Sequence, residues 1–229
     1  MRIGLIADIH SNLPALDAML RALANVDMLV CAGDLVGYYN SPNEVCALIR
    51  DKAQFVVRGN HEDLLSDTSP QAVDDMYTDW TRSVLAADNL RWLTSLPEES
   101  EFRIDEALVH VRHTVKSGEY VYPGSPLLSQ IHLGFSELMV IGHTHHPMME
   151  HCGAGTVVNP GSVGQPRDLD PRPSFAVLET NTGEVVFGRT EYDIQHLQSE
   201  LRSLKWDEAL INRLQLAWPA TISPLAQKK

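Results

Sequence analysis

The chain has 229 residues, 44% hydrophobic and 21% charged, a balance that is ordinary for one globular domain with a sizeable core. Its net charge of −12 argues against non-specific binding to duplex DNA or RNA, although a small phosphorylated substrate is still allowed if divalent cations reverse the charge locally. Three scattered cysteines argue against a disulfide framework, and Asp8 interrupts the opening apolar run too early for a signal peptide or a spanning helix. We therefore expect a cytoplasmic protein that does not interact with membranes.

The first sixty residues alternate between short apolar runs and amphipathic stretches. Asn12 and Ser41 stand where helices are expected to begin, each followed by a proline within two residues. Strands joined by helices predict a parallel sheet with right-handed crossovers, and ligands bind such sheets at the carboxyl ends of the strands. Asp8, Asp34 and Asn60 fall at these ends. The expected strands are 3–7, 27–32 and 55–57.

The middle of the chain is expected to be helical before it returns to strands. A helical stretch opens at Ser69-Pro70 and runs through Trp80 and Leu85, and a second short helix covers 88–95. Two neighbouring strands are expected at 102–104 and 107–111, followed by a short helix at 127–133. That helix leads into the buried run of residues 138–141, after which come Gly142, His143, Thr144 and His145.

The pattern of the sequence changes after Met148. Short strands separated by turns at 153–155 and 181–183 predict a second, more antiparallel sheet packed on the first. Two terminal helices are expected, one through Ile194 to Leu204 and one over 207–216. We predict a single α/β domain over residues 1–218 and a flexible tail over 219–229.

Side chains with nitrogen or oxygen donors follow the predicted strands. His143 and His145 alone could be two ordinary loop histidines, but an i, i+2 pair in extended backbone would point both imidazoles the same way. Together with the other donors that follow the strands they make seven predicted ligands. Seven are too many for one tetrahedral zinc and suit two divalent ions that share a carboxylate. The absence of thiolate favours manganese, with iron, zinc, cobalt or nickel as alternatives. The predicted ligands are Asp8, His10, Asp34, Asn60, His110, His143 and His145.

The order of these motifs resembles that of the calcineurin-like metallophosphoesterases over about residues 1–190. The loop at 159–167, NPGSVGQPR, is similar to that of the small bacterial and archaeal phosphodiesterase branch, which shares its fold with a eukaryotic retromer scaffold subunit. The resemblance implies two stacked mixed β-sheets flanked by helices on both sides, a four-layer sandwich. It rests on Asp8-Ile9-His10, Gly33-Asp34, Gly59-Asn60-His61-Glu62, His110 and Gly142-His143-Thr144-His145.

The resemblance also implies a role for each ligand. One ion would be held by Asp8, His10 and His145, and the other by Asn60, His110 and His143, with Asp34 between them.

Three further residues are candidates for the reaction itself. By the same resemblance His61 would bind no metal and would face the substrate, as proton donor or as stabiliser of the phosphoryl oxygens. Arg167 and Arg58 could clamp a phosphate by bidentate hydrogen bonds, although surface ion pairs are the alternative for both.

The expected reaction is hydrolysis of phosphodiesters or small phosphomonoesters, because two divalent ions lower the pKa of a shared water and the metal-bound hydroxide can attack phosphorus in line. A dinucleoside polyphosphate hydrolase or a protein phosphatase is an alternative. However, Leu35 to Tyr39 stand where protein phosphatases have a further Asp and Arg. A non-catalytic scaffold is the other alternative, and the presence of His61 favours catalysis. The expected partner is a small phosphate ester, and homo-oligomerisation is left open.

A second departure concerns the strand-borne histidine. The family usually has glycine after it, whereas Val111, Arg112 and His113 follow His110 here. We therefore expect a more crowded neighbourhood at the second ion, in which a site role for His113 is an open alternative.

Overall fold

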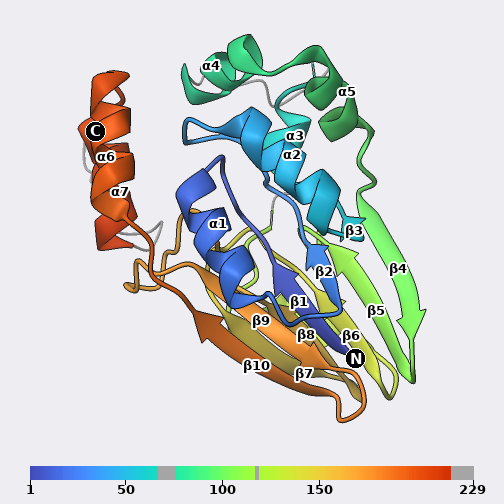
Figure 1. Ribbon diagram of the computed structural model, residues 1–229. Coiled ribbons are helices and arrows are strands. Elements are labelled where there is room, and N and C mark those ends of the chain that lie inside the picture. Colours follow the sequence, from blue (N-terminus) through green and yellow to red (C-terminus); the bar gives the residue numbers. More distant parts are fainter. Residues whose placement is uncertain (67–75, 117–118, 218–229) are drawn as a thin grey trace.

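The computed structural model describes residues 1–66, 76–116 and 119–217. Two five-stranded sheets lie face to face and are flanked by helices (Figure 1). The strands of the first sheet in spatial order are β10 (Glu184–Arg189), β9 (Ser174–Glu179), β1 (Arg2–Ile6), β2 (Met28–Cys31) and β3 (Phe55–Val56). In this sheet β1, β2 and β3 are parallel, β9 is antiparallel to β1, and β10 is antiparallel to β9.

The second sheet is also mixed. Its three central strands are parallel, and an antiparallel strand pairs with each side of them. The expected pair of stacked mixed sheets is therefore confirmed. The strands in spatial order are β4 (Glu99–Ile104), β5 (Ala107–Arg112), β6 (Glu137–Val140), β8 (Gly155–Asn159) and β7 (Met148–Cys152).

The assignment of strands to sheets differs from the expectation. We expected the strands after Met148 to form a second, more antiparallel sheet, but β9 and β10 return to the first sheet, and β7 and β8 join β4, β5 and β6. The reason is that β1 is a buried central strand with hydrogen-bonding groups on both edges. Since β2 fills one edge, β9 is needed on the other, where Ile3 pairs with Leu178.

Alternate residues of β1 serve two different cores. Ile3 and Leu5 point between the sheets, toward side chains such as Val109 and Val140 of the second sheet. Ile6 points the other way, into the core formed with helices α1 (Leu13–Ala22) and α2 (Pro42–Lys52). As expected, α1 begins after Asn12, whose side-chain oxygen accepts a hydrogen bond from the backbone N–H of Ala15.

The helices that come next after β3 lie beyond the carboxyl ends of the first sheet's parallel strands (Figure 1). The first is a helical turn that the sequence pattern did not predict, α3 (Asn60–Asp63). It is followed by α4 (Met76–Val84) and α5 (Ala87–Ser95), while Ser69-Pro70, where we expected α4 to open, lie outside the described residues. The expected helix at 127–133 is a short 3₁₀ helix, η1 (Pro126–Gln130).

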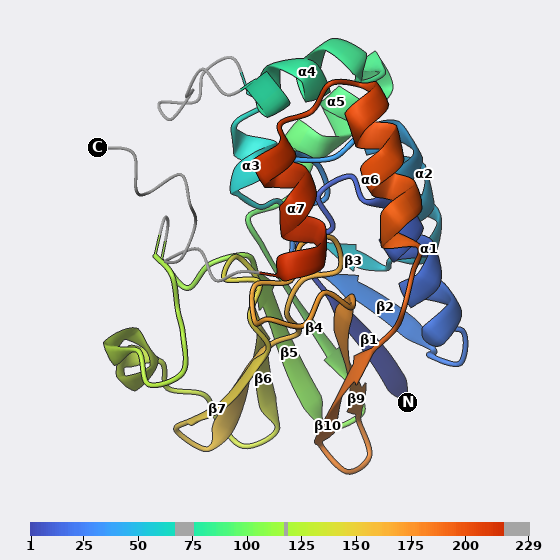
Figure 2. The ribbon, with the colours of Figure 1, turned by 90° about the vertical axis from the view of Figure 1, so that its left-hand side faces the viewer.

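Two helices end the described part of the chain. Figure 2 shows α6 (Ile194–Ser203) and α7 (Glu208–Leu216) side by side. The tail that we expected over 219–229 lies outside the described residues. Within the described ranges, the helices are all too short or too polar to cross a bilayer.

Candidate metal centre

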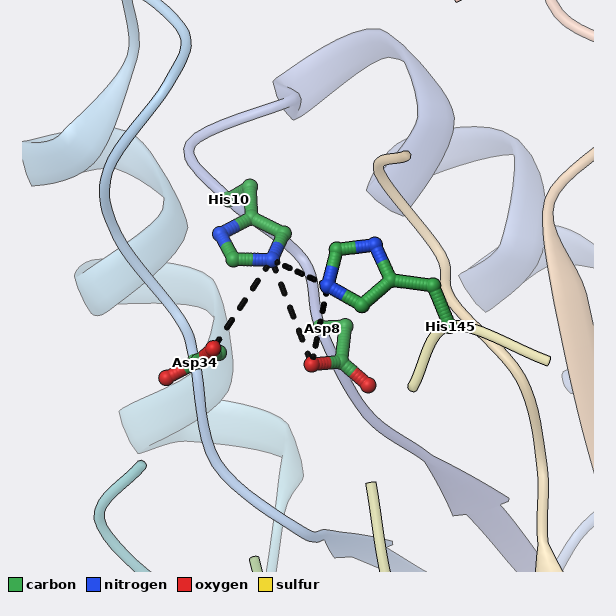
Figure 3. A group of neighbouring side chains, drawn as sticks. All are labelled: Asp8, His10, Asp34 and His145. Carbon is green, nitrogen blue, oxygen red and sulfur yellow. Dashed lines mark hydrogen bonds and ion pairs between the residues drawn. The ribbon is translucent and has the colours of Figure 1, made fainter. Parts of the chain in front are cut away.

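Four buried side chains from three turns converge in the first candidate metal group. Asp8, His10, Asp34 and His145 each offer one ligand atom, and these atoms all lie within 4.8 Å of one another. Figure 3 shows the carboxylates and imidazoles pointing toward a common centre. Each residue is at most 2% exposed, so the carboxylates and imidazoles interact in a dry environment. Asp8 and His10 follow β1, Asp34 follows β2, and His145 follows β6.

The two imidazoles of this group face each other through their Nε2 atoms, which lie 3.0 Å apart. His10 Nδ1 lies 3.2 Å from the carbonyl oxygen of Val36, and His145 Nδ1 lies 2.6 Å from that of Gln165. A carbonyl only accepts, so both Nδ1 atoms carry the proton. Burial lowers the pKa of both histidines well below the usual value, which keeps the rings neutral. Two Nε2 lone pairs are therefore directed at each other.

This pair of lone pairs fits a bound cation. Without a positive charge between them the two nitrogens repel, whereas two imidazole ligands of one ion, each at ~2.1 Å, lie roughly 3 Å apart. His145 Nε2 is also 3.4 Å from Asp8 Oδ1, and His10 Nε2 is 3.8 Å from Asp34 Oδ2. Two neutral nitrogens and two carboxylates form a donor set that suits a divalent metal ion.

A second group shares Asp34 with the first. It consists of Asp34, His113 and His143, with the side-chain oxygen of Asn60 beside both imidazoles. Asn60 Oδ1 is 3.1 Å from His113 Nε2 and 2.8 Å from His143 Nδ1, and His113 Nε2 is 3.3 Å from Asp34 Oδ2. The other ring nitrogen of His143, Nε2, is buried without a hydrogen-bond partner among the described residues. Asp34 therefore stands where a carboxylate shared by two ions is expected.

The expected ligand His110 is not in either group, and His113 occupies the place we had assigned to it. Along β5, Val109 and Val111 point into the core between the sheets, so His110 points to the other face. There its ring lies 3.1 Å from Glu101 and 3.8 Å from Glu137. His113 comes just past the end of β5 and lies on the same inward-facing side as Val109 and Val111. Its Nδ1 lies 2.7 Å from the carbonyl oxygen of Ala32. Among the described residues, His113 and not His110 joins the candidate metal group.

The protonation of the cluster follows from burial and from the pairing of Asp34 with His113. Burial disfavours the imidazolium form of His113, but the carboxylate of Asp34 outweighs burial and raises the pKa of His113 to about 10. Burial would raise the pKa of Asp34, but the positive charges of His113 and His61 hold it well below its usual range. Burial also raises the pKa of Asp8 to about 7 and lowers that of His143 to about 4.

The backbone at the cluster is held in an unusual conformation. Asp8, His10, Asp34, His143 and His145 have φ angles between 52° and 73°, in the left-handed region that non-glycine residues rarely adopt. The strand β6 ends at Val140, so the extended backbone that we expected at the two histidines is not present, and His143 and His145 belong to different groups. Such strain persists only where the surrounding structure fixes it, and it concentrates at functional sites.

Glu62 supplies part of that support, and the sequence analysis gave it no role. Its carboxylate accepts backbone hydrogen bonds of 2.8 to 3.2 Å from Asp34, Leu35, Val36 and Gly59. The side chain is 1% exposed, and burial together with the charge of Asp34 raises its pKa to about 8. Glu62 thus fixes the turn that presents Asp34. The only signal in the sequence was an acidic residue directly after Asn60 and His61.

The loop of residues 159–167 fixes the other two turns. Ser162 Oγ donates to the carbonyl oxygen of Asp8 at 2.6 Å, and Asn159 donates to that of Gly142 at 2.7 Å. Gly164 passes so close to the first turn that a Cβ there would lie 1.9 Å from the carbonyl oxygen of Ile9. Only glycine allows this approach, which explains the residue at this point of the loop.

The two arginines that are candidates for substrate binding have different surroundings. Arg167 is 9% exposed, and its backbone N–H donates to the carbonyl oxygen of His145 at 3.2 Å, which puts it beside the first group. Arg58 instead forms ion pairs with Asp63 and Glu98, as the surface alternative predicted.

His61 lies beside the first group without belonging to it. Its ring is edge-on to that of His10, with centroids 4.7 Å apart, and its backbone N–H donates to Asp34 Oδ1 at 2.9 Å. On the side of the second group, the ring of Tyr120, which is 48% exposed, stacks on His143 at 4.2 Å.

Comparison with known proteins agrees with this arrangement. A family model described as a calcineurin-like phosphoesterase superfamily domain matches residues 1–183. An uncharacterized protein of Methanocaldococcus jannaschii, MJ0912, is 31% identical over an alignment that covers 93% of this chain and 96% of that protein.

Solved structures share the fold over almost the whole chain. A metallophosphoesterase from Sphaerobacter thermophilus has a TM-score of 0.77 at 31% identity, covering 95% of this chain and 99% of that chain. The hypothetical protein PH1004 from Pyrococcus horikoshii OT3 has a TM-score of 0.82 at 21% identity, covering 96% and 99%. On the family match and these identities, the chain belongs to the calcineurin-like phosphoesterase superfamily.

Proposed function

We propose that this chain is a phosphoesterase that hydrolyses phosphodiesters or small phosphomonoesters with two divalent metal ions. The observation that carries the proposal is the pair of donor groups joined by Asp34, in the first of which the neutral imidazole nitrogens of His10 and His145 converge on carboxylate oxygens. Structural ion pairs can also bury carboxylates beside histidines. They do not, however, direct two unprotonated nitrogens at each other, as His10 and His145 do here.

The residues divide between the two ions along the observed groups. Asp8, His10 and His145 would hold one ion, Asn60, His113 and His143 the other, and Asp34 would contact both. When bound, two such ions would lower the pKa of a coordinated water toward neutrality and neutralise charge on the phosphoryl oxygens. Nitrogen and oxygen donors without thiolate favour manganese, with iron, zinc, cobalt and nickel as alternatives.

Arg167 would bind the phosphate group of the substrate. Its guanidinium donates to Gln165 Oε1 at 3.0 Å and lies 3.5 Å from the hydroxyl of Tyr38. The acids next to it in sequence are paired elsewhere, Asp168 with Arg189 and Asp170 with Arg172. A buried cation that has no carboxylate partner among the described residues, beside a candidate metal group, can bind a non-bridging phosphate oxygen by charge-assisted hydrogen bonds.

His61 would donate the proton that the leaving oxygen needs. It lies beside the metal-binding residues, in ring contact with His10, but belongs to neither donor group. A positioned general acid of this kind contributes roughly 10²–10⁴-fold to the rate.

The test is a panel of phosphate esters with the manganese-loaded protein. The panel should include an alkyl phosphodiester, a nitrophenyl phosphodiester, small phosphomonoesters and a phosphopeptide. We expect turnover of diesters or small monoesters, no turnover of the phosphopeptide, and loss of activity in Asp34→Asn. Arg58→Ala serves as the matched control for Arg167→Ala, because only the second should raise KM. A protein that binds two ions and hydrolyses none of the panel would be a scaffold instead.

A further inference from the structure

We infer that the C-terminal helices α6 and α7 set the orientation of His61, acting through Trp206 and the Gly37-Tyr38 turn. These helices begin after residue 183, where the match to the family model ends. Trp206 lies between them and is 7% exposed. The inference assigns Trp206 and Tyr38 as positioning residues; its kinetic part rests on the proposed function and its structural part does not.

The first step is the contact between the helices and the turn. Trp206 Nε1 donates a hydrogen bond of 2.7 Å to the backbone carbonyl oxygen of Tyr38, and this is a link between residues 168 positions apart. The ring of Trp206 belongs to an apolar cluster that also contains Tyr39, Leu197 and Ile211. The two helices therefore contact the turn both through the hydrogen bond and through packing.

The second step is the contact between the turn and His61. Gly37 has a φ of +92°, and a Cβ at this position would lie 2.2 Å from His61 Nδ1. The ring of Tyr38 lies 4.7 Å from that of His61 and 4.6 Å from that of His10. The turn thus forms one wall of the space that the His61 ring occupies, and a shift of the turn must move or release the ring.

The third step is that the turn needs outside support. Tyr38 has a φ of 56°, a left-handed conformation that costs a non-glycine side chain energy and persists only where the surroundings impose it. Its carbonyl is oriented by Trp206 and its hydroxyl lies near Arg167. Removing the indole donor removes the hydrogen bond that orients the Tyr38 carbonyl, while a phenyl ring still fills most of the space of the indole.

The test compares Trp206→Phe with Trp80→Phe. Trp80 contacts Trp206 edge-on at 4.7 Å in the same cluster, so its replacement is a matched loss of indole packing. Each variant is first checked for an unfolding midpoint close to that of the parent. The position of the His61 ring is then followed in metal-free protein by its Hε1 NMR resonance, assigned through His61→Ala. We expect the resonance to move toward that of an exposed histidine in Trp206→Phe only.

The kinetic part uses a double-mutant cycle with the manganese-loaded protein. Trp206→Phe should lower kcat about 5- to 10-fold on an alkyl phosphate ester, as expected for one lost hydrogen bond, with KM unchanged. It should cause no further loss when combined with His61→Ala. Losses that multiply in the double variant, or a His61 resonance that stays in place, would overturn the inference.

Two outcomes are kept apart by this design. If Trp206→Phe does not fold, the variant Tyr38→Leu, which lacks the ring that packs on His61, is used in place of Trp206→Phe. The expected results are the same. If the resonance moves but neither parent nor variants hydrolyse any ester, the proposed function fails while the positioning of His61 by Trp206 stands.

Discussion

His10 Nε2 and His145 Nε2 lie 3.0 Å apart although both nitrogens carry a lone pair and neither carries a proton. The two residues are 135 positions apart, and each is fixed by a backbone carbonyl on the far side of its ring. The protein therefore holds two repelling nitrogens together in the dry interior, at the spacing that a shared metal ion requires.

Removal of metal should destabilise the fold, because the cation would offset this repulsion and the charges of the two carboxylates. With free metal at 100 times its dissociation constant, binding stabilises the folded state by ~2.7 kcal/mol. For a chain of this size, that corresponds to a fall of roughly 5–10 °C in Tm when chelator is added. Differential scanning calorimetry with and without EDTA measures it, and an unchanged Tm would contradict the account.

His110, in β5, and His113, just past its end, can be compared directly as metal ligands. His113→Ala should lose one of two bound ions and most of the activity, because its Nε2 faces Asp34 and Asn60. His110→Ala should keep both ions and change the rate less than about twofold, since its ring lies between Glu101 and Glu137 on the outer face. Metal analysis of both variants decides the assignment, and the reverse pattern would restore the sequence-based prediction.

Most of the candidate ligands, but not the choice between His110 and His113, could be predicted from the sequence. The apolar runs and the polar residues after them identified the strand ends, so Asp8, His10, Asp34, Asn60, His143 and His145 were expected together and do converge. His110 and His113 could not be separated in the same way. The choice depends on where β5 ends, which pairing with β4 and β6 decides, and on which face of the sheet is buried, which the packing of the two sheets decides.

Two other features of the fold could not be predicted from the sequence, because they depend on contacts between distant segments. The return of β9 to the edge of β1 is a pairing across about 170 residues, for which a single sequence carries no local signal. The role of Glu62 depends on four backbone N–H groups from two different turns, which no spacing rule brings together.

Metal binding should release protons and strengthen as pH rises. In the metal-free fold the pKa of His113 is raised to about 10, so its imidazole is protonated at pH 7 and must lose that proton to bind a metal ion. Asp8, with a pKa of about 7, is half protonated and adds to the release. Titration calorimetry at pH 7 in buffers of different ionisation enthalpy should report at least one proton released for each chain loaded. A heat that does not depend on the buffer would contradict the protonation of His113.

His61→Ala should keep its fold and its metals, because His61 belongs to neither donor group. Its rate should fall by roughly 10²–10⁴-fold on an alkyl phosphate ester and much less on a nitrophenyl ester, whose leaving group departs without a proton. Parallel kinetics on the two esters measure the difference. Loss of a metal ion in this variant would make His61 a ligand, and full activity on both esters would remove its acid role.

The most direct measurement is the number of metal ions bound by the active protein, with Asp34→Asn beside His145→Ala. Asp34 lies in both donor groups and His145 in one. The account predicts two manganese ions for each fully active chain, about one in His145→Ala, and a greater loss of metal and activity in Asp34→Asn than in His145→Ala. One ion for each chain in fully active, fully loaded protein would contradict it.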